Sequence, residues 1–252
     1  NALLKEYPLS DYSYEKDWLF KVTPVLGKKI MTNINDSTVV TSTALFSLAI
    51  LSSDGFSISK RELVSRIELL KSLLEEDKYS PKTLVCEKTG EEIINQMRKL
   101  GFLSKEDIND RISLTNLEAA KLSFYRNNIS HLLIFESLIC GFFQYQKEII
   151  KEDLLQSIKM IYPFLKDEFF LKWDEADLDE LINLKLNKLI NKNLLQEDSN
   201  VFRRPDFKSK EFYETQSLGK LVQPSIDRFY VLISQLWKNS AEHISKNELE
   251  RN

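Results

Sequence analysis

Glycine and proline are scarce in this chain, whose 252 residues contain six of each. Glycine-rich loops that hold phosphate groups, and the tight turns of many-stranded folds, need more of these residues than the chain supplies. The composition therefore favours helices over a sheet-rich fold.

Cysteine and histidine are rarer still, with two of each. Cys86 and Cys140 cannot form a disulfide framework, and their surroundings indicate a reducing compartment. Cys140 lies in an apolar helical run, which predicts a small buried hydrophobe rather than a reactive thiol. With so few histidines a zinc site is not expected, and no cofactor is predicted.

No long apolar run and no excess of one charge is present. The longest apolar stretch, residues 131–143, contains Glu136 and is shorter than the ~18–20 residues that span a bilayer. We expect this chain by itself to be soluble, with any membrane contact peripheral. The 35 basic and 38 acidic residues are interleaved, which argues against nucleic acid as a partner.

A six-residue pattern occurs three times, at residues 58–63, 149–154 and 244–249. Each copy follows an apolar helical segment and opens another helix. In a capping box, a hydroxyl or carboxylate and a Glu three positions later bind the first backbone amides of a helix. Such boxes are predicted at Ser59–Glu62, Thr89–Glu92, Thr115–Glu118, Asp177–Glu180 and Ser245–Glu248. The middle copy has Ile150 at the cap position, so its helix start must be stabilised otherwise.

Short segments after the second helix of each copy are expected to pair as wings: 102–103 with 112–114, and 194–195 with 201–202. The sequence thus predicts a mainly α fold with two winged-helix-like units, joined by a long helix that contains Arg126. Pro163 is expected to kink or end its helix. Residues 197–210 are predicted to form a polar loop.

The third copy stops early, which indicates four segments along the chain. We expect a longer parent polypeptide, because a half-repeat cannot bury its apolar face and because the sequence lacks an initiator Met. The predicted segments are a connecting segment (1–37), a first unit (38–114), a second unit (115–206) and the start of a truncated third unit (207–252).

Residues 124–132 resemble the Tyr-Tyr-Arg-Asn-Asn-Ile-x-His segment of bacterial membrane-associated glycerol-3-phosphate 1-O-acyltransferases. Blocks at 42–45, 79–85, 161–166 and 168–173 resemble further segments of that family in the same order. The signature residues that carry the resemblance are Tyr125, Arg126, Asn127, Asn128, His131, Tyr162, Pro163 and Trp173.

The resemblance implies a C-terminal region whose parent acylates the sn-1 hydroxyl of glycerol 3-phosphate, with acyl-CoA or acyl carrier protein as donor, in phospholipid synthesis. It also implies the cytoplasmic face of the inner membrane. The family's catalytic His-x4-Asp motif lies N-terminal to the matched region, so no catalytic residue is assigned. The expected partner is the parent's own N-terminal catalytic domain, and the expected role is scaffolding, membrane docking or regulation.

Neither histidine supplies that motif here. His131 is followed five positions later by Glu136, and His243 by Glu248. In a continuous helix His131 and Glu136 would lie on different faces, and Glu248 is explained as a capping partner. Both histidines are therefore predicted to be non-catalytic.

Arg126 is the one candidate for ligand binding, as a contact to phosphate or to the acyl donor. The alternative is that Arg126, Asn127 and Asn128 hydrogen-bond loop backbone between the repeats. The acidic residues between Asp174 and Glu180 are interpreted as helix caps rather than a cation site. Two other function classes stay open: a stand-alone interaction module and a winged-helix nucleic-acid-binding regulator.

Overall fold

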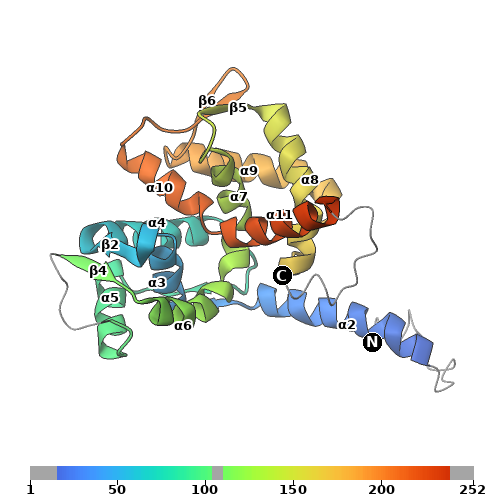
Figure 1. Ribbon diagram of the computed structural model, residues 1–252, viewed down its shortest axis with the longest axis horizontal. Helices are drawn as coiled ribbons and strands as arrows, with labels where there is room; N and C mark the ends of the chain where they lie inside the picture. Colours follow the sequence, from blue (N-terminus) through green and yellow to red (C-terminus); the bar gives the residue numbers. More distant parts are fainter. Residues whose placement is uncertain (1–15, 104–109, 239–252) are drawn as a thin grey trace.

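The computed structural model describes residues 16–103 and 110–238. Most of them are helical, and the strands are short, so the predicted mainly α fold is confirmed (Figure 1). The elements in chain order are α2 (Lys16–Asp36), β1 (Val39–Val40), α3 (Ser42–Leu51), η2 (Asp54–Phe56), β2 (Ser57–Ser59), α4 (Lys60–Glu76), β3 (Leu84–Val85), α5 (Gly90–Lys99), β4 (Arg111–Ser113), α6 (Asn116–Asn127), η3 (Ser130–Leu133), α7 (Ile134–Phe142), β5 (Glu148–Ile150), α8 (Lys151–Phe169), η4 (Glu175–Asp177), α9 (Leu178–Asn191), β6 (Gln196–Asp198), β7 (Val201–Arg203), α10 (Lys210–Gly219) and α11 (Gln223–Lys238).

The two predicted units have matching orders of elements. In the first, α3, β2, α4 and α5 precede β4, which pairs antiparallel with β2. In the second, α7, β5, α8 and α9 precede β6 and β7, and β7 pairs antiparallel with both β5 and β6. Describing each as winged-helix-like remains an interpretation of this order. Their buried side chains form one continuous hydrophobic core.

The prediction of strands at residues 102–103 and 194–195 is wrong, because both segments form the ends of helices instead. Gly101 has a φ of 76°, and directly after it the Phe102 amide donates to the Met97 carbonyl at 3.0 Å. The Leu194 amide donates to the Leu189 carbonyl at 2.9 Å in the same way. These bonds close the last helical turns. The second hairpin begins only at β6, so the loop predicted from residue 197 is also misplaced.

The starts of α4 and α8 are each held by the residue that directly precedes the last strand of the same unit, β4 or β7. The Lys60 amide donates to the Asp110 carbonyl at 3.0 Å, and the Lys151 amide donates to the Asn200 carbonyl at 3.0 Å. Asp110 and Asn200 both have positive φ, at 58° and 77°. This backbone bond supplies the stabilisation that Ile150, which makes no side-chain cap, cannot give.

Two of the predicted capping boxes are present in full, at Thr89–Glu92 and Thr115–Glu118. At α4 only half is made: the Ser59 hydroxyl accepts from the Glu62 amide, while the Glu62 carboxylate binds Arg66. The box predicted at residues 177–180 is wrong. It lies three residues earlier, between Asp174 and Asp177, and the box at 245–248 falls outside the described residues.

The prediction that one long, continuous helix joins the two units is wrong. α6 ends at Asn127, and the short η3 turn separates it from α7. The Ser130 hydroxyl donates to the Arg126 carbonyl at 2.9 Å, which satisfies an acceptor at the end of α6 and lets the chain change direction. His131 therefore lies in a 3₁₀ turn.

Pro163 does not end α8, which continues to Phe169. A proline inside a helix removes one backbone bond and usually costs ~3 kcal/mol. Tyr162 and Leu165 on either side of it are buried, and their packing offsets that cost. The expectation of a helix end was therefore wrong because tertiary contacts outweigh local preference.

A buried ionic network joins three helices from both units. The Glu136 carboxylate on α7 lies 2.9 Å from the Lys188 ammonium and 3.2 Å from the Lys185 ammonium, both on α9. Lys185 also pairs with Asp77, the residue that ends α4. Burial by itself raises the pKa of Glu136, but the two lysines outweigh it and hold that pKa below its ordinary value.

Replacing Glu136 with Gln should leave Lys188 buried without its counter-charge. We expect a loss of about 3–5 kcal/mol in the free energy of unfolding at pH 7, measured by urea denaturation. The matched control is Asp179→Asn, which breaks the exposed pair with Lys159 and should cost less than about 1 kcal/mol. Equal losses in the two variants would contradict a special role for the buried network.

Candidate functional site

Several signature residues meet in one buried aromatic cluster, made of Tyr79, His131, Phe135, Tyr162 and Trp173. The Tyr79 ring meets those of His131 and Trp173 edge-on, with centroids 5.1 and 4.8 Å apart. Phe135 stacks on Tyr162, whose hydroxyl donates to the Trp173 carbonyl at 2.6 Å. Residues from four separate segments thus form one structural unit.

His131 is 4% exposed and faces protein rather than solvent. Its Nε2 lies 3.3 Å from the Thr38 hydroxyl. Burial lowers the pKa of His131 to about 4, against the weaker raising effects of a backbone hydrogen bond at Asn35 and of the Asp36 carboxylate. The ring is therefore neutral at physiological pH and is held as part of the core.

Glu136, the carboxylate five positions after His131, is committed to the lysines of α9. Burial opposes ionisation of this carboxylate, but the charges of Lys185 and Lys188, together with the hydrogen bond that Lys188 donates, lower its pKa and keep it ionised in the core. The two side chains that a His-x4-Asp comparison singles out are therefore used for different structural purposes.

Lys172 lies at the edge of the aromatic cluster. Its ammonium donates to the Tyr79 carbonyl, pairs with Asp36 at 3.2 Å and lies 4.4 Å from the centre of the Tyr79 ring. A cavity of about 140 Å³ opens beside it, lined by Tyr79, His131, Phe135, Trp173 and Lys185 among others. This volume is below the ~300 Å³ at which small-molecule pockets usually begin.

The remaining signature residues, apart from Pro163, lie at the end of α6. Tyr125 packs edge-on against Phe102 and Phe124. The Arg126 guanidinium donates to the Asn127 side-chain oxygen at 3.1 and 3.2 Å, and Asn127 and Asn128 are exposed. Burial lowers the pKa of Arg126, and the nearby Arg228 adds to that effect. Pro163 is an exposed position on α8.

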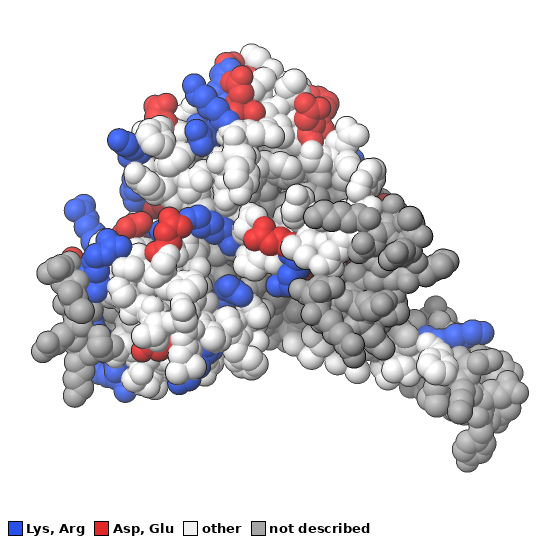
Figure 2. All heavy atoms as spheres, viewed as in Figure 1, with Lys and Arg blue, Asp and Glu red and all other residues white. Residues whose placement is uncertain are grey.

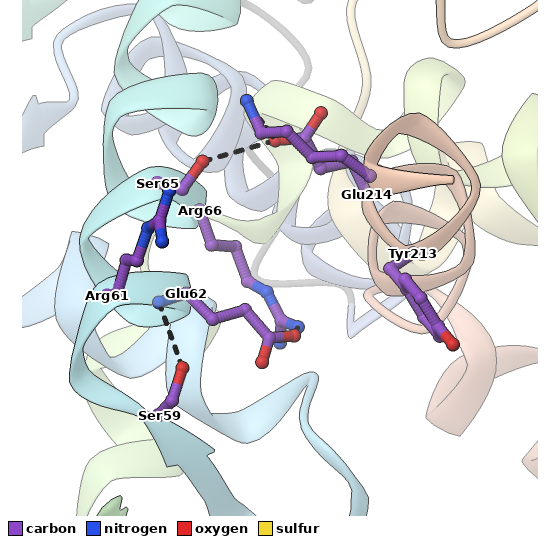
Figure 3. A pocket seen from close by; sticks show the side chains of 8 residues that line it. Ser59, Arg61, Glu62, Ser65, Arg66, Tyr213 and Glu214 are labelled. Atoms are coloured by element: carbon purple, nitrogen blue, oxygen red, sulfur yellow. Dashed lines mark hydrogen bonds and ion pairs between the residues drawn. The ribbon is translucent and has the colours of Figure 1, made fainter. Parts of the chain in front are cut away.

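A larger concave surface lies elsewhere, between α4 and α10. Two adjoining hollows of about 490 and 410 Å³ share Glu62, Arg66 and Tyr213. Figure 3 shows the first, with Ser59, Arg61, Glu62, Ser65 and Arg66 on α4 and its start, and with Tyr213 and Glu214 on α10. The first copy of the repeat, residues 58–63, supplies Ser59, Arg61 and Glu62, but no sequence pattern identifies α10 as the facing wall.

The charged groups of the cleft are largely engaged with one another. Arg66 binds Glu62 at 3.1 Å and also donates to the Ala49 carbonyl and to the Ser52 and Ser53 hydroxyls. Glu214 accepts from Ser65 at 3.4 Å and pairs with Lys210 at 3.3 Å. The cleft is thus a polar contact between the first unit and α10, with ion pairs in place of an acid–base couple.

Other candidates also have structural roles. Cys140 is fully buried, as predicted, and burial raises the pKa of its thiol. Asp174 caps η4 and pairs with Lys166, in keeping with the capping interpretation. No group of three His, Cys, Asp or Glu side chains suited to a metal ion occurs within residues 16–103 and 110–238. His243 lies outside the described residues.

The surface carries both signs of charge close together, as the face in Figure 2 shows. On α9, Lys185 and Lys188 are buried in the network with Glu136, and Lys192 pairs with Glu76. In the winged-helix interpretation α9 would be the helix that contacts DNA, and these internal pairs leave it without a row of cations for a phosphate backbone. Crossing a bilayer would require a longer apolar helix than any in the described part of the chain.

Comparison with known proteins agrees with the sequence resemblance. The family model for the glycerol-3-phosphate acyltransferase C-terminal region matches residues 5–252. The chain is 28% identical over 239 residues to glycerol-3-phosphate acyltransferase of Pseudomonas fluorescens (strain Pf0-1), covering 94% of this chain and 29% of that protein. The proteins of that name from Pseudomonas savastanoi pv. phaseolicola and Pseudomonas aeruginosa (strain LESB58) are 27% and 28% identical, with the same coverage.

The chain thus spans about three tenths of the length of these curated relatives. The match extends over nearly all of it and includes the segments that form the aromatic cluster. The chain belongs to the family of glycerol-3-phosphate acyltransferase C-terminal regions.

Proposed function

We propose that this chain is the non-catalytic C-terminal region of an enzyme that transfers an acyl group from acyl-CoA or acyl carrier protein to the sn-1 hydroxyl of glycerol 3-phosphate. The observation that carries the proposal is the family match over residues 5–252, combined with the names of relatives more than three times as long. Its role is to support an N-terminal catalytic domain of the same polypeptide.

The state of His131 supports a non-catalytic role. A general base works best with a pKa near the operating pH and within reach of the proton that it removes. His131 is buried in the aromatic cluster with its pKa lowered to about 4. The imidazole that activates the glycerol hydroxyl is accordingly assigned to the part of the parent that precedes this region.

The rival function classes have less support. A stand-alone interaction module does not account for relatives of which this chain covers 29%. A nucleic-acid-binding regulator would need cations that α9 uses internally. Arg126 remains a proposed ligand contact of the assembled enzyme, since its guanidinium is only half-buried and donates to the side chain of the neighbouring Asn127.

Residues 1–252 alone should show no acyl transfer to glycerol 3-phosphate, assayed with radiolabelled glycerol 3-phosphate and both donor types. In the full-length parent, His131→Gln should reduce kcat by less than about tenfold, because loss of a general base usually costs about 10²–10⁴. Turnover by residues 1–252, or a parent inactivated by His131→Gln while still folded, would overturn the proposal.

The pH dependence of stability offers an independent check on His131. Since its folded pKa of about 4 lies below the ordinary value of 6.5, the unfolded chain binds a proton between these values that the folded chain does not. Stability is therefore full above pH 6.5 and falls as the pH drops through this window. We expect a loss of about 2 kcal/mol between pH 7 and pH 5.

Urea denaturation at both pH values measures this loss. His131→Gln should remove most of the difference between pH 7 and pH 5, whatever it does to stability at pH 7. If the variant shows the same difference as the unmodified chain, His131 is not the group that titrates.

We further propose peripheral contact with the cytoplasmic face of the inner membrane through the last turns of α11. The first half of this helix packs on the body, where Phe229 meets Phe164. The apolar side of α11 then continues into solvent through Leu232, Leu236 and Trp237, and Trp237 is 82% exposed. Aromatic and aliphatic side chains on an exposed helix are suited to the interfacial layer of a bilayer.

Flotation with vesicles of phosphatidylcholine and phosphatidylglycerol tests this contact. Residues 1–252 should float, and Trp237→Glu should reduce the floating fraction severalfold. Gln235→Glu adds the same charge on the opposite side of α11 and should leave flotation unchanged. Failure of the unmodified chain to float would assign membrane contact to another part of the parent.

A further inference from the structure

Helix α2 has its polar face towards the rest of the protein. Three polar side chains at positions 28, 32 and 35 make its contacts with the end of α8. The Lys28 ammonium lies 3.4 Å from Asp167, the Thr32 hydroxyl donates to the Phe170 carbonyl at 3.4 Å, and the Asn35 amide donates to the Phe169 carbonyl at 2.6 Å. A helix that packed on its own domain in the usual way would bury its apolar face instead.

The apolar face of α2 points away from the body. With about 100° between successive residues, Leu26, Ile30 and Ile34 share one side, opposite the three contact positions. Phe20 and Met31 extend this apolar stripe, which we define as Phe20, Leu26, Ile30, Met31 and Ile34. All five are exposed, from 36% for Met31 to 76% for Phe20. Figure 1 shows α2 extending beyond the rest of the described chain.

Gly27 lies within the stripe, between Leu26 and Ile30 on the same side. A Cβ built there would meet nothing within 4 Å, so nothing in the part of the chain that the structure describes requires glycine at that position. Glycine in a helix costs about 1 kcal/mol relative to alanine, and its benefit is close approach of another backbone. The position fits a partner that packs tightly on the stripe.

The charges on α2 favour a protein surface over lipid. Helices that lie in a membrane interface carry cations beside the apolar face, where the side chains reach the headgroups. On α2, Lys21 lies on the far side from Ile30, and Lys28, beside Met31, is already paired with Asp167. Lys29 flanks the stripe on the Leu26 side, so a lipid surface facing the stripe would meet one flanking cation rather than a row on each side.

We infer that the apolar stripe of α2 docks on the catalytic part of the parent polypeptide, which precedes this region in the relatives. The inference rests on the proposed function. Relatives more than three times as long, matched in their C-terminal region, supply a large preceding segment, and α2 is the first described element after it. Because α2 touches its own body through a few polar groups, the docked partner holds it in place.

Hydrogen–deuterium exchange tests the docking directly. The backbone amides of α2 should exchange at least about tenfold more slowly in the full-length parent, without lipid, than in residues 1–252 alone. Equal protection in the two proteins would show that the stripe is covered by this chain itself or not covered at all. Protection that appears only with phosphatidylglycerol vesicles would assign the stripe to lipid. Each of these results overturns the inference.

Two substitutions localise the effect to the stripe. Ile30→Asp should abolish the added protection in the parent, whereas Lys21→Asn, with the same change in net charge on the opposite face of α2, should retain it. Gly27→Met adds a good helix former where this chain has open space, so α2 should be at least as protected as before in residues 1–252. In the parent it should lose the added protection, because the bulk blocks close approach.

The two proposals can fail separately. If the full-length protein does not acylate glycerol 3-phosphate but α2 is protected in it, the proposed function fails and the docking stands. An active parent in which α2 exchanges as fast as in the isolated region leaves the function in place and rejects the docking.

Discussion

The buried carboxylate of Glu136 is the constraint on which the arrangement of the two units depends. Burying one ion is unfavourable by several kcal/mol, so α7, α9 and the end of α4 must bring Lys188, Lys185 and Asp77 into reach together. Hydrophobic packing alone tolerates sliding of one helix on another, whereas an ionic network does not. The aromatic cluster then fills the space that this fixed geometry leaves beside α7 and α8.

Local rules predicted the parts of the fold that depend on neighbours in sequence. The mainly α class and the capping boxes at Thr89 and Thr115 rest on side chains within one helical turn. Residues 102–103 and 194–195 were misassigned because apolar character is shared by strands and by the closing turns of helices. The continuation of α8 through Pro163 depends on the tertiary packing of Tyr162 and Leu165, which no local pattern contains. The break after Asn127 is accompanied by a local bond from the Ser130 hydroxyl to the Arg126 carbonyl, which apolar periodicity does not reveal.

The candidate site likewise combines features that the sequence predicts with contacts that only the fold creates. The sequence marked His131, Tyr162 and Trp173 as signature residues, yet only the fold brings them to Tyr79 and Phe135. No sequence pattern marks Lys185 and Lys188 as core residues, since partners 49 or more positions away are invisible to helical periodicity; the structure buries both. The family match and the buried imidazole both support the proposal that this region is non-catalytic.

The carbonyls of Asp110 and Asn200, each bound to the first amide of a helix some fifty residues earlier, have a consequence for how this duplicated architecture can diverge. A backbone carbonyl accepts a hydrogen bond whichever residue carries it. Because this carbonyl already binds the first amide of the helix, the residue at the cap position does not need a capping side chain. One copy retains Ser59 and the other has Ile150, with the same backbone bond in both. The two halves can therefore drift apart in sequence while keeping a common framework, and the turn residues with positive φ are where drift should be slowest.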